Sequence, residues 1–158
     1  MRTKPNQSYT FHEPITAHQI LDKAAEILSV QYLRNDVFIN PQATKDYLSY
    51  KLGGYDKEVF AVMMLDSQHR LNEFRELFFG TIDSASVYPR EVVKAVLEAN
   101  AAAVIFAHNH PSGNPEPSKA DKDITKRLSD ALGLIDVRVL DHIVVGETST
   151  SFAERGLL

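Results

Sequence analysis

A dense group of polar residues follows a short apolar run in the second half of the chain. Residues 103–107, AVIFA, lead directly into HNHPSGNPEPSKAD, residues 108–121. In an extended backbone His108 and His110 point to the same side, and Asn109 points to the other. Two imidazoles on one side can bind a single ion, and zinc accepts such a pair readily. The spacing therefore predicts a metal site.

Asp121 is expected to be the third ligand. The loop after His110 contains Pro and Gly and turns the chain back, and a helix predicted to begin after Ser118 places Asp121 in its first turn, facing the histidines. The chain has no cysteine, so only His, Asp or Glu can hold the metal. Three protein ligands leave one position for a water molecule, whose pKa on zinc falls to about 7. We therefore predict hydrolytic chemistry with Zn2+ as the cofactor.

Hydrolysis also needs a base for the water and a donor for the developing oxyanion. Ser118 can supply the donor, because it lies three residues before Asp121 and offers a hydroxyl beside the ion. The same pair resembles a capping box with Asp in place of Glu, and Ser118 can serve both purposes. The base must come from elsewhere, and the residues alone leave four carboxylates open: Glu58, Glu73, Glu76 and Glu91.

Four further polar residues have roles that the pattern leaves open. Ser112 lacks both a G-x-S-x-G elbow and an orienting acid, so we interpret it as a residue that shapes the loop. Asp141 and His142 either support the ligands from a strand or form an ordinary polar pair, and we favour the polar pair. Arg90 either contacts an acidic group of a partner or simply lies in the first turn of a helix.

Helix and strand patterns alternate along the part of the chain that must position these residues. Two apolar runs, 58–66 and 69–83, are separated by turn residues and predict an antiparallel pair of strands. After them the pattern predicts a helix from Pro89, a buried strand over 103–107, a helix ending at Gly133 and a strand over 135–146. The alternation predicts an α/β layered domain. On the helix from Pro89, the residues expected to face the core are Val92, Val93, Val96 and Leu97.

The beginning of the chain has a different character. Residues 1–14 are polar with two prolines and are expected to form a flexible arm. Residues 15–54 are expected to form an N-terminal helical segment of two helices. On the first helix Ile20, Ala24, Ile27 and Leu28 form one stripe; the second has Asn40 as N-cap, Pro41 as its first residue and Gly53 as terminator.

Composition narrows the class of protein. The chain has 158 residues, 44% hydrophobic and 24% charged, which is typical of one globular domain with a short appendage. Its net charge of −4 argues against nonspecific binding to DNA. It contains neither a stretch of signal-peptide type nor a run of roughly 20 apolar residues. We therefore expect a cytoplasmic protein that does not enter a membrane.

These motifs resemble the JAB/MPN metalloproteases with the JAMM motif, which consists of a distant Glu, His-x-His, seven residues, Ser, two residues and Asp. His108 and His110, then PSGNPEP, Ser118, KA and Asp121 reproduce that spacing. The segments YPREVVKAVLEANAAAVIFAHNHPSG and LDHIVVG are similar to sequences of the RadC-like branch of the family. The likeness covers about residues 55–158.

The resemblance implies a zinc site, a general acid/base and a fold. The family's distant glutamate corresponds to Glu58, at the start of EVFAVMMLD. The implied fold is a mixed β-sheet flanked by helices on both sides, similar to cytidine deaminases, here preceded by two helices. Longer RadC-like proteins carry a helix-hairpin-helix module, and residues 1–53 lack its G-x-G signature, so we expect the short form.

The resulting hypothesis is a zinc-dependent hydrolase that cleaves a peptide or isopeptide bond in an unknown protein or peptide substrate. The alternative is a DNA-repair or DNA-transaction accessory protein whose JAB domain is a binding or structural module; the acidic charge and the missing hairpin module count against it. A metal-free scaffold is disfavoured because every motif residue is present. Deaminase chemistry is excluded because its cysteine ligands are absent. Substrate identity and oligomeric state are not encoded in these patterns.

Overall fold

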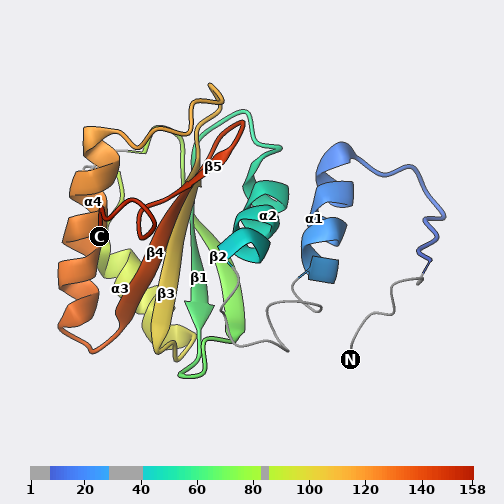
Figure 1. Cartoon of the computed structure of the whole chain (residues 1–158). Coiled ribbons are helices and arrows are strands. Elements are labelled where there is room, and N and C mark those ends of the chain that lie inside the picture. The colour runs from blue at the N-terminus through green and yellow to red at the C-terminus, as the bar shows by residue number, and fades with distance from the viewer. Residues whose placement is uncertain (1–7, 29–40, 83–85) are drawn as a thin grey trace.

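The protein is built on one mixed sheet of five strands (Figure 1). The computed structural model describes residues 8–28, 41–82 and 86–158. The strands are β1 (Val59–Leu65), β2 (Leu71–Phe79), β3 (Ala103–Asn109), β4 (Arg138–Val145) and β5 (Ser149–Ser151). The helices are α1 (Ala17–Leu28), α2 (Pro41–Leu52), α3 (Pro89–Glu98) and α4 (Lys119–Gly133).

The strand order is β2-β1-β3-β4-β5. Neighbouring strands are antiparallel except β3 and β4, which are parallel and joined by the crossover helix α4. Every residue of β1 and β3 is buried. Their almost unbroken apolar sequences are typical of central strands with both faces covered, whereas β2, at one edge, is mostly half-buried.

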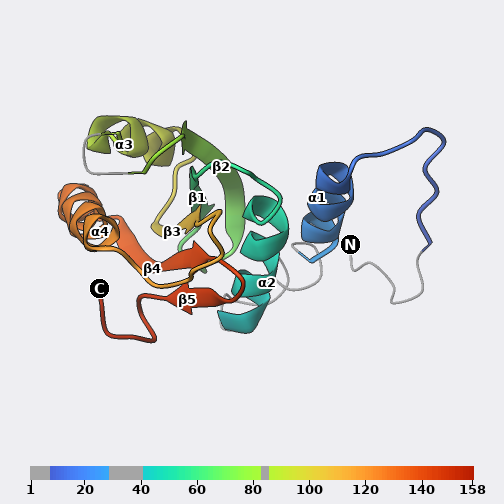
Figure 2. The same cartoon turned by 90° about the horizontal axis from the view of Figure 1, so that it is seen from above.

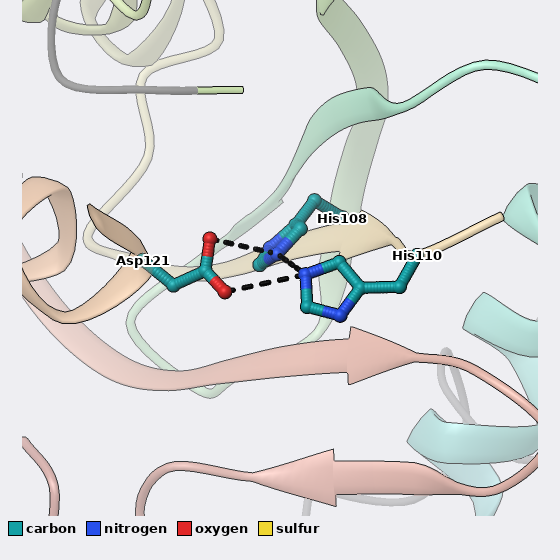
Figure 3. A group of neighbouring side chains, drawn as sticks. All are labelled: His108, His110 and Asp121. Atoms are coloured by element: carbon teal, nitrogen blue, oxygen red, sulfur yellow. Dashed lines mark hydrogen bonds and ion pairs between the residues drawn. The ribbon is translucent and has the colours of Figure 1, made fainter. Parts of the chain in front are cut away.

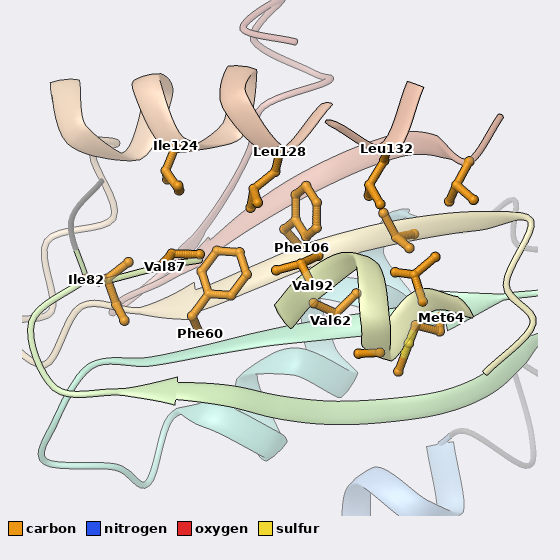
Figure 4. Packing of buried hydrophobic residues seen from close by; sticks show 14 residues of the cluster. Phe60, Val62, Met64, Ile82, Val87, Val92, Phe106, Ile124, Leu128 and Leu132 are labelled. Carbon is orange, nitrogen blue, oxygen red and sulfur yellow. The ribbon is translucent and has the colours of Figure 1, made fainter. Parts of the chain in front are cut away.

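Helices cover both faces of the sheet (Figure 2). On one face α3 and α4 enclose a core that includes Phe60, Phe106 and Leu128 (Figure 4). On the other face α2 packs Leu48 and Leu52 against the sheet, and α1 lies beyond α2. The α/β architecture with a mixed sheet flanked by helices on both sides, preceded by two helices, is therefore confirmed.

The strand registers bring distant parts of the chain together. In the antiparallel pair of β1 and β3, Phe60 lies opposite His108. In the parallel pair of β3 and β4, Phe106 lies opposite His142. As a result, the beginning of β1, the end of β3 and the middle of β4 meet beside the first turn of α4, at the carboxyl end of the parallel strands, where α/β sheets bind ligands.

Several local expectations differ from the structure. Ile20 and Leu97, both expected on buried stripes, are 52% and 59% exposed. On α1 the buried residue is Ala25; on α3 the predicted Val92 and Val96 are buried, and they are joined by Ala95 in place of Leu97. Successive helical residues are about 100° apart around the axis. Because the buried stripe of α3 includes Ala95, the side chain of Leu97, two positions later, points away from the core. Strand β5 was not predicted, because three polar residues carry no strand pattern.

The ends of the N-terminal helices follow local chemistry where they are described. Helix α2 ends at Leu52, directly before Gly53. A Cβ on Gly53 would lie 2.5 Å from the Ser49 carbonyl oxygen, so glycine is needed at this terminus. The predicted N-cap, Asn40, lies outside the described residues, as do residues 1–7 of the predicted arm. Over the ranges that the structure describes, no helix combines the length and apolar character needed to cross a bilayer.

Candidate metal centre

The three predicted metal ligands converge at the end of β3 (Figure 3). His108 and His110 come from β3 and the residue after it, and Asp121 comes from the first turn of α4. The Nε2 atoms of the histidines are 3.0 Å apart. Asp121 Oδ1 lies 3.2 Å from His108 Nε2, and Asp121 Oδ2 lies 3.2 Å from His110 Nε2.

These separations fit a tetrahedral metal ion. With ligand bonds of 2.0–2.1 Å, the ligand atoms of tetrahedral zinc lie about 3.3 Å from one another. His108 and Asp121 are buried, and His110 is partly buried and borders a cavity. The group can therefore hold a metal ion while leaving a side open toward that cavity.

A buried chain of hydrogen bonds sets the tautomer of His108. The Thr125 hydroxyl donates to the Asp121 carbonyl at 2.6 Å, so its oxygen accepts the proton of His142 Nδ1, also at 2.6 Å. His142 Nε2 then has only a lone pair and accepts from His108 Nδ1 at 2.7 Å. His108 consequently keeps an unprotonated Nε2, the atom that faces the other ligands.

His142 is fully buried, and its surroundings favour the neutral ring that this chain requires. Burial lowers the pKa of His142 well below its ordinary value, and a positive charge on a protonated His108 or His110 lowers it further, against the effect of the negative charge of Asp121. The Phe152 ring stacks on His142 with centroids 4.7 Å apart. The ordinary polar pair that we favoured for residues 141 and 142 does not describe His142, because His142 bonds directly to His108, one of the three predicted ligands.

Asp141 lies on the opposite face of β4 from that ligand network. Its carboxylate accepts hydrogen bonds from the backbone N–H groups of His142 and Ala153 and from the Ser151 hydroxyl. Burial raises the pKa of Asp141, against the effect of these hydrogen bonds. Asp141 therefore connects β4 to β5 and the following turn, and it does not touch the ligands' side chains.

His110 is oriented by the loop that follows it. Its Nδ1 donates to the Asn114 carbonyl at 2.8 Å, which leaves Nε2 directed at the site. Gly113 adopts a left-handed conformation with φ of 83°, and its carbonyl accepts from Glu147 N–H at 2.7 Å. A Cβ on Gly146 would lie 2.5 Å from the Gly113 oxygen, so glycine is required where the loop packs against the turn after β4.

Ser118 and Asp121 form the predicted capping box at the beginning of α4. Ser118 Oγ accepts from Asp121 N–H at 3.0 Å, and Asp121 Oδ2 accepts from Ser118 N–H at 2.7 Å. This reciprocal pair fixes the carboxylate at the site. Ser112 Oγ accepts from Asn114 N–H at 3.3 Å, as expected of a residue that shapes the loop.

The electrostatics of the ligand group are strongly coupled. Burial by itself would raise the pKa of Asp121, but hydrogen bonds with His108 and His110, the positive charge of His108 when its ring is protonated, and the Ser118 N–H hold that pKa well below its usual range. The hydrogen bond with Asp121 raises the pKa of His110 above its ordinary value against the effect of burial, and the negative charge of Glu58 adds to this rise. The carboxylate is therefore ionised at neutral pH, and a proton competes with metal at His110.

Glu58 is the one of the four glutamate candidates that the structure brings to this site. It precedes β1 and lines the same cavity as His110, Ser118 and Asp121. Glu58 Oε2 accepts from the Ile82 N–H at 2.6 Å.

The other three candidates are occupied elsewhere. Glu73 pairs with Arg75 at 2.8 Å, and Glu76 accepts from the Tyr55 hydroxyl at 2.7 Å. Glu91 lies 3.5 Å from Arg90, whose side chain is 84% exposed. None of the three glutamates lines the cavity next to the described ligands.

The sequence of this chain is similar to one protein family and to several bacterial proteins. The family model of the RadC-like JAB domain matches residues 38–157. A UPF0758 protein of Vibrio cholerae serotype O1 is 67% identical over 89% of this chain and 90% of its own length. A second UPF0758 protein of that organism is 60% identical over 98% of both chains. A UPF0758 protein of Aeromonas hydrophila is 56% identical, and there the chain spans 62% of the relative's length.

Proposed function

The chain belongs to the family of RadC-like JAB domain proteins, and on that basis we propose that it is a zinc-dependent hydrolase of the JAMM metalloprotease type. Its substrate would be a peptide or isopeptide bond in a protein or peptide. The observation that carries the proposal is the convergence of two imidazole Nε2 atoms and one buried carboxylate beside a cavity that also contains a second carboxylate, Glu58.

His108, His110 and Asp121 would hold the ion. Two imidazole nitrogens and one carboxylate suit zinc better than magnesium or calcium, which prefer oxygen ligands. Zinc bound there would lower the pKa of water and polarise the substrate carbonyl. The hydrogen bonds of His108 to His142 and of His110 to Asn114 support this assignment, because they keep both Nε2 lone pairs free for the metal.

Glu58 would move the proton during hydrolysis. Its carboxylate lines the cavity, and the Ile82 N–H holds one of its oxygens in place. In this position the carboxylate accepts a proton from the attacking water and returns it to the nitrogen of the leaving group. The side-chain amide of Gln has nearly the same shape but cannot accept that proton, which makes Glu58→Gln the sharpest test.

Ser118 would stabilise the oxyanion. Its oxygen accepts a hydrogen bond from the Asp121 N–H, so its own hydroxyl hydrogen remains available to a group in the cavity. A donor of this kind stabilises the negative charge that develops on the carbonyl oxygen. Capping of α4 and stabilisation of the oxyanion are therefore compatible in one residue.

The test combines metal analysis with hydrolysis assays. Elemental analysis of wild type is expected to give one zinc per chain, and His108→Ala and Asp121→Ala are expected to lose it. With a panel of peptides and isopeptide-linked probes, Glu58→Gln should lower kcat by about 10²- to 10⁴-fold while still binding zinc. Glu91→Gln, on the surface of α3 and outside the cavity, is the matched control and should keep full activity.

Two results would contradict the proposal. Absence of zinc binding by the wild type would remove the hydrolase and favour a scaffold or the DNA-accessory alternative, for which a salt-dependent DNA titration is the direct measurement. Full hydrolysis by Glu58→Gln would show that a different group moves the proton.

A further inference from the structure

Asn109, the residue between the two histidine ligands, has a buried side chain that bonds to the backbone next to Glu58. As expected from strand alternation, its side chain lies on the other face from the imidazoles. It is 3% exposed. Its Oδ1 accepts from the Val59 N–H at 2.7 Å, and its Nδ2 donates to the Lys57 carbonyl at 2.8 Å.

These two bonds hold both peptide units that flank Glu58. The Lys57 carbonyl belongs to the peptide unit before Glu58, and the Val59 N–H belongs to the unit after it. Because each peptide unit is planar, orienting both units leaves little freedom for rotation about the Glu58 Cα. The direction in which the Glu58 side chain leaves the backbone is thereby set by the Asn109 amide.

The Asn109 amide takes the place of a peptide group in a neighbouring strand. Regular pairing between β1 and β3 reaches Phe60 and His108. Beyond that pair the side-chain amide continues the hydrogen bonding, with one acceptor and one donor, as a backbone would. Asp could not donate to the Lys57 carbonyl in its ionised form, and Ala would provide neither group.

Two further bonds hold Glu58 from the side of β2. Gly80 N–H donates to the Glu58 carbonyl at 2.9 Å, and Ile82 N–H donates to Glu58 Oε2 at 2.6 Å. The backbone of Glu58 is thus held between β3 and the segment after β2, and its carboxylate is held at the cavity. Asn109 supplies all of the described side-chain contacts to this backbone from β3.

We infer that Asn109 is a positioning residue for Glu58: the two histidines of the HNH segment point to the proposed metal site, and the asparagine between them holds the backbone from which Glu58 reaches the same cavity. This inference rests on the proposed function, in which Glu58 moves the proton. It gives a role to Asn109, the middle residue of the motif, for which the spacing of the metal ligands implies no role. Misplacement of a catalytic group by about 1 Å can cost about 100-fold in rate.

The test compares Asn109→Ala with Asp66→Ala in the full chain. Asp66 is the matched control, because its Oδ1 accepts from the N–H groups of Gln68 and Arg70 at the opposite end of β1. Each variant loses two side-chain hydrogen bonds to the backbone that are shorter than 3 Å, and Asn109→Ala also loses a longer one to the Tyr55 carbonyl, but only the short bonds of Asn109 flank Glu58. The measurements are zinc stoichiometry, kcat, and amide hydrogen exchange of Ile82, whose N–H bonds to the Glu58 carboxylate.

Asn109→Ala is expected to bind one zinc per chain. Its Ile82 amide should exchange hydrogen about tenfold or more faster than in the wild type, and its kcat should be lower by about 10- to 100-fold. Asp66→Ala should leave the exchange of Ile82 and kcat unchanged. In the Glu58→Gln background, Asn109→Ala should cause no further loss of kcat, because the residue acts through Glu58. A merely structural role would lower the rate equally in both backgrounds.

The exchange measurement decides the inference independently of any substrate. If Ile82 exchanges equally slowly in Asn109→Ala and wild type, or if Asn109→Ala loses zinc, the positioning role is wrong even where the wild type is active. If the zinc-loaded wild type cleaves no peptide while Ile82 exchange still depends on Asn109, the proposed hydrolase fails and the positioning of Glu58 is supported.

Discussion

Replacing His142 by Leu is expected to weaken zinc binding without removing any metal ligand. The substitution keeps a similar volume beside Phe152 but deletes the acceptor, 2.7 Å away, for the proton on His108 Nδ1. The proton on His108 Nδ1 then has no hydrogen-bond acceptor, and water cannot replace the lost acceptor because His108 is fully buried. His108 can avoid the loss by moving the proton to Nε2, where it donates to Asp121 Oδ1, 3.2 Å away.

The magnitude follows from this shift of tautomer. A buried unpaired donor costs about 1–3 kcal/mol. The metal-free variant avoids that cost by using the other tautomer, but zinc must reverse the shift in order to bind Nε2. The cost therefore appears in the metal affinity, where 1–3 kcal/mol corresponds to a loss of about 5- to 150-fold.

Two measurements check this expectation. Competition with a zinc indicator at pH 7.5 gives the affinity, and nitrogen chemical shifts of the imidazoles give the tautomer of His108 in the metal-free protein. His18→Leu is the control, since His18 pairs with Asp22 on α1 and lies away from the described ligands. If folded His142→Leu binds zinc as tightly as the wild type and keeps the proton on Nδ1, the hydrogen-bond chain does not select the ligand atom.

Three other outcomes follow from the same geometry. Ser118→Ala should destabilise the protein by about 0.5–2 kcal/mol, because it removes the N-cap of α4, and should also lower kcat. Chemical denaturation measures the stability. If stability falls while kcat is unchanged, Ser118 caps the helix but does not stabilise the oxyanion. Zinc affinity should rise with pH and then become constant above the raised pKa of His110, because below that pKa protons compete with zinc for the ring, whereas the lowered pKa of Asp121 keeps its carboxylate ionised throughout. Titration calorimetry in two buffers should show that zinc binding releases fewer protons as the pH rises. A release that stays constant with pH would contradict this. Ile124→Ala should lower the free energy of unfolding by about 2–5 kcal/mol, because this side chain of α4 is fully buried against the sheet, while Leu134→Ala, at an exposed position, should change it little.

The convergence of His108, His110 and Asp121 was predictable because its determinants are local. The faces of His108 and His110 follow from strand alternation, and the position of Asp121 follows from the capping box with Ser118. Hydrophobic patterns also predicted β1 to β4, α1, α3 and α4, whereas α2 was predicted from the residue types at its ends. The hydrophobic patterns misjudged Ile20 and Leu97, since periodicity identifies a stripe only within about one residue and packing decides which side is covered.

Tertiary structure decided the groups that complete the site. Among four candidate glutamates, the residues alone could not choose Glu58; pairing of β1 with β3 brings Val59 to Asn109, 50 residues away, and places Glu58 at the cavity. The parallel pairing of β3 and β4 similarly brings His142 to His108 across 34 residues. A sequence pattern specifies which way a side chain points from its own strand, but the neighbour that it meets depends on strand order and register, which arise only when the whole sheet forms.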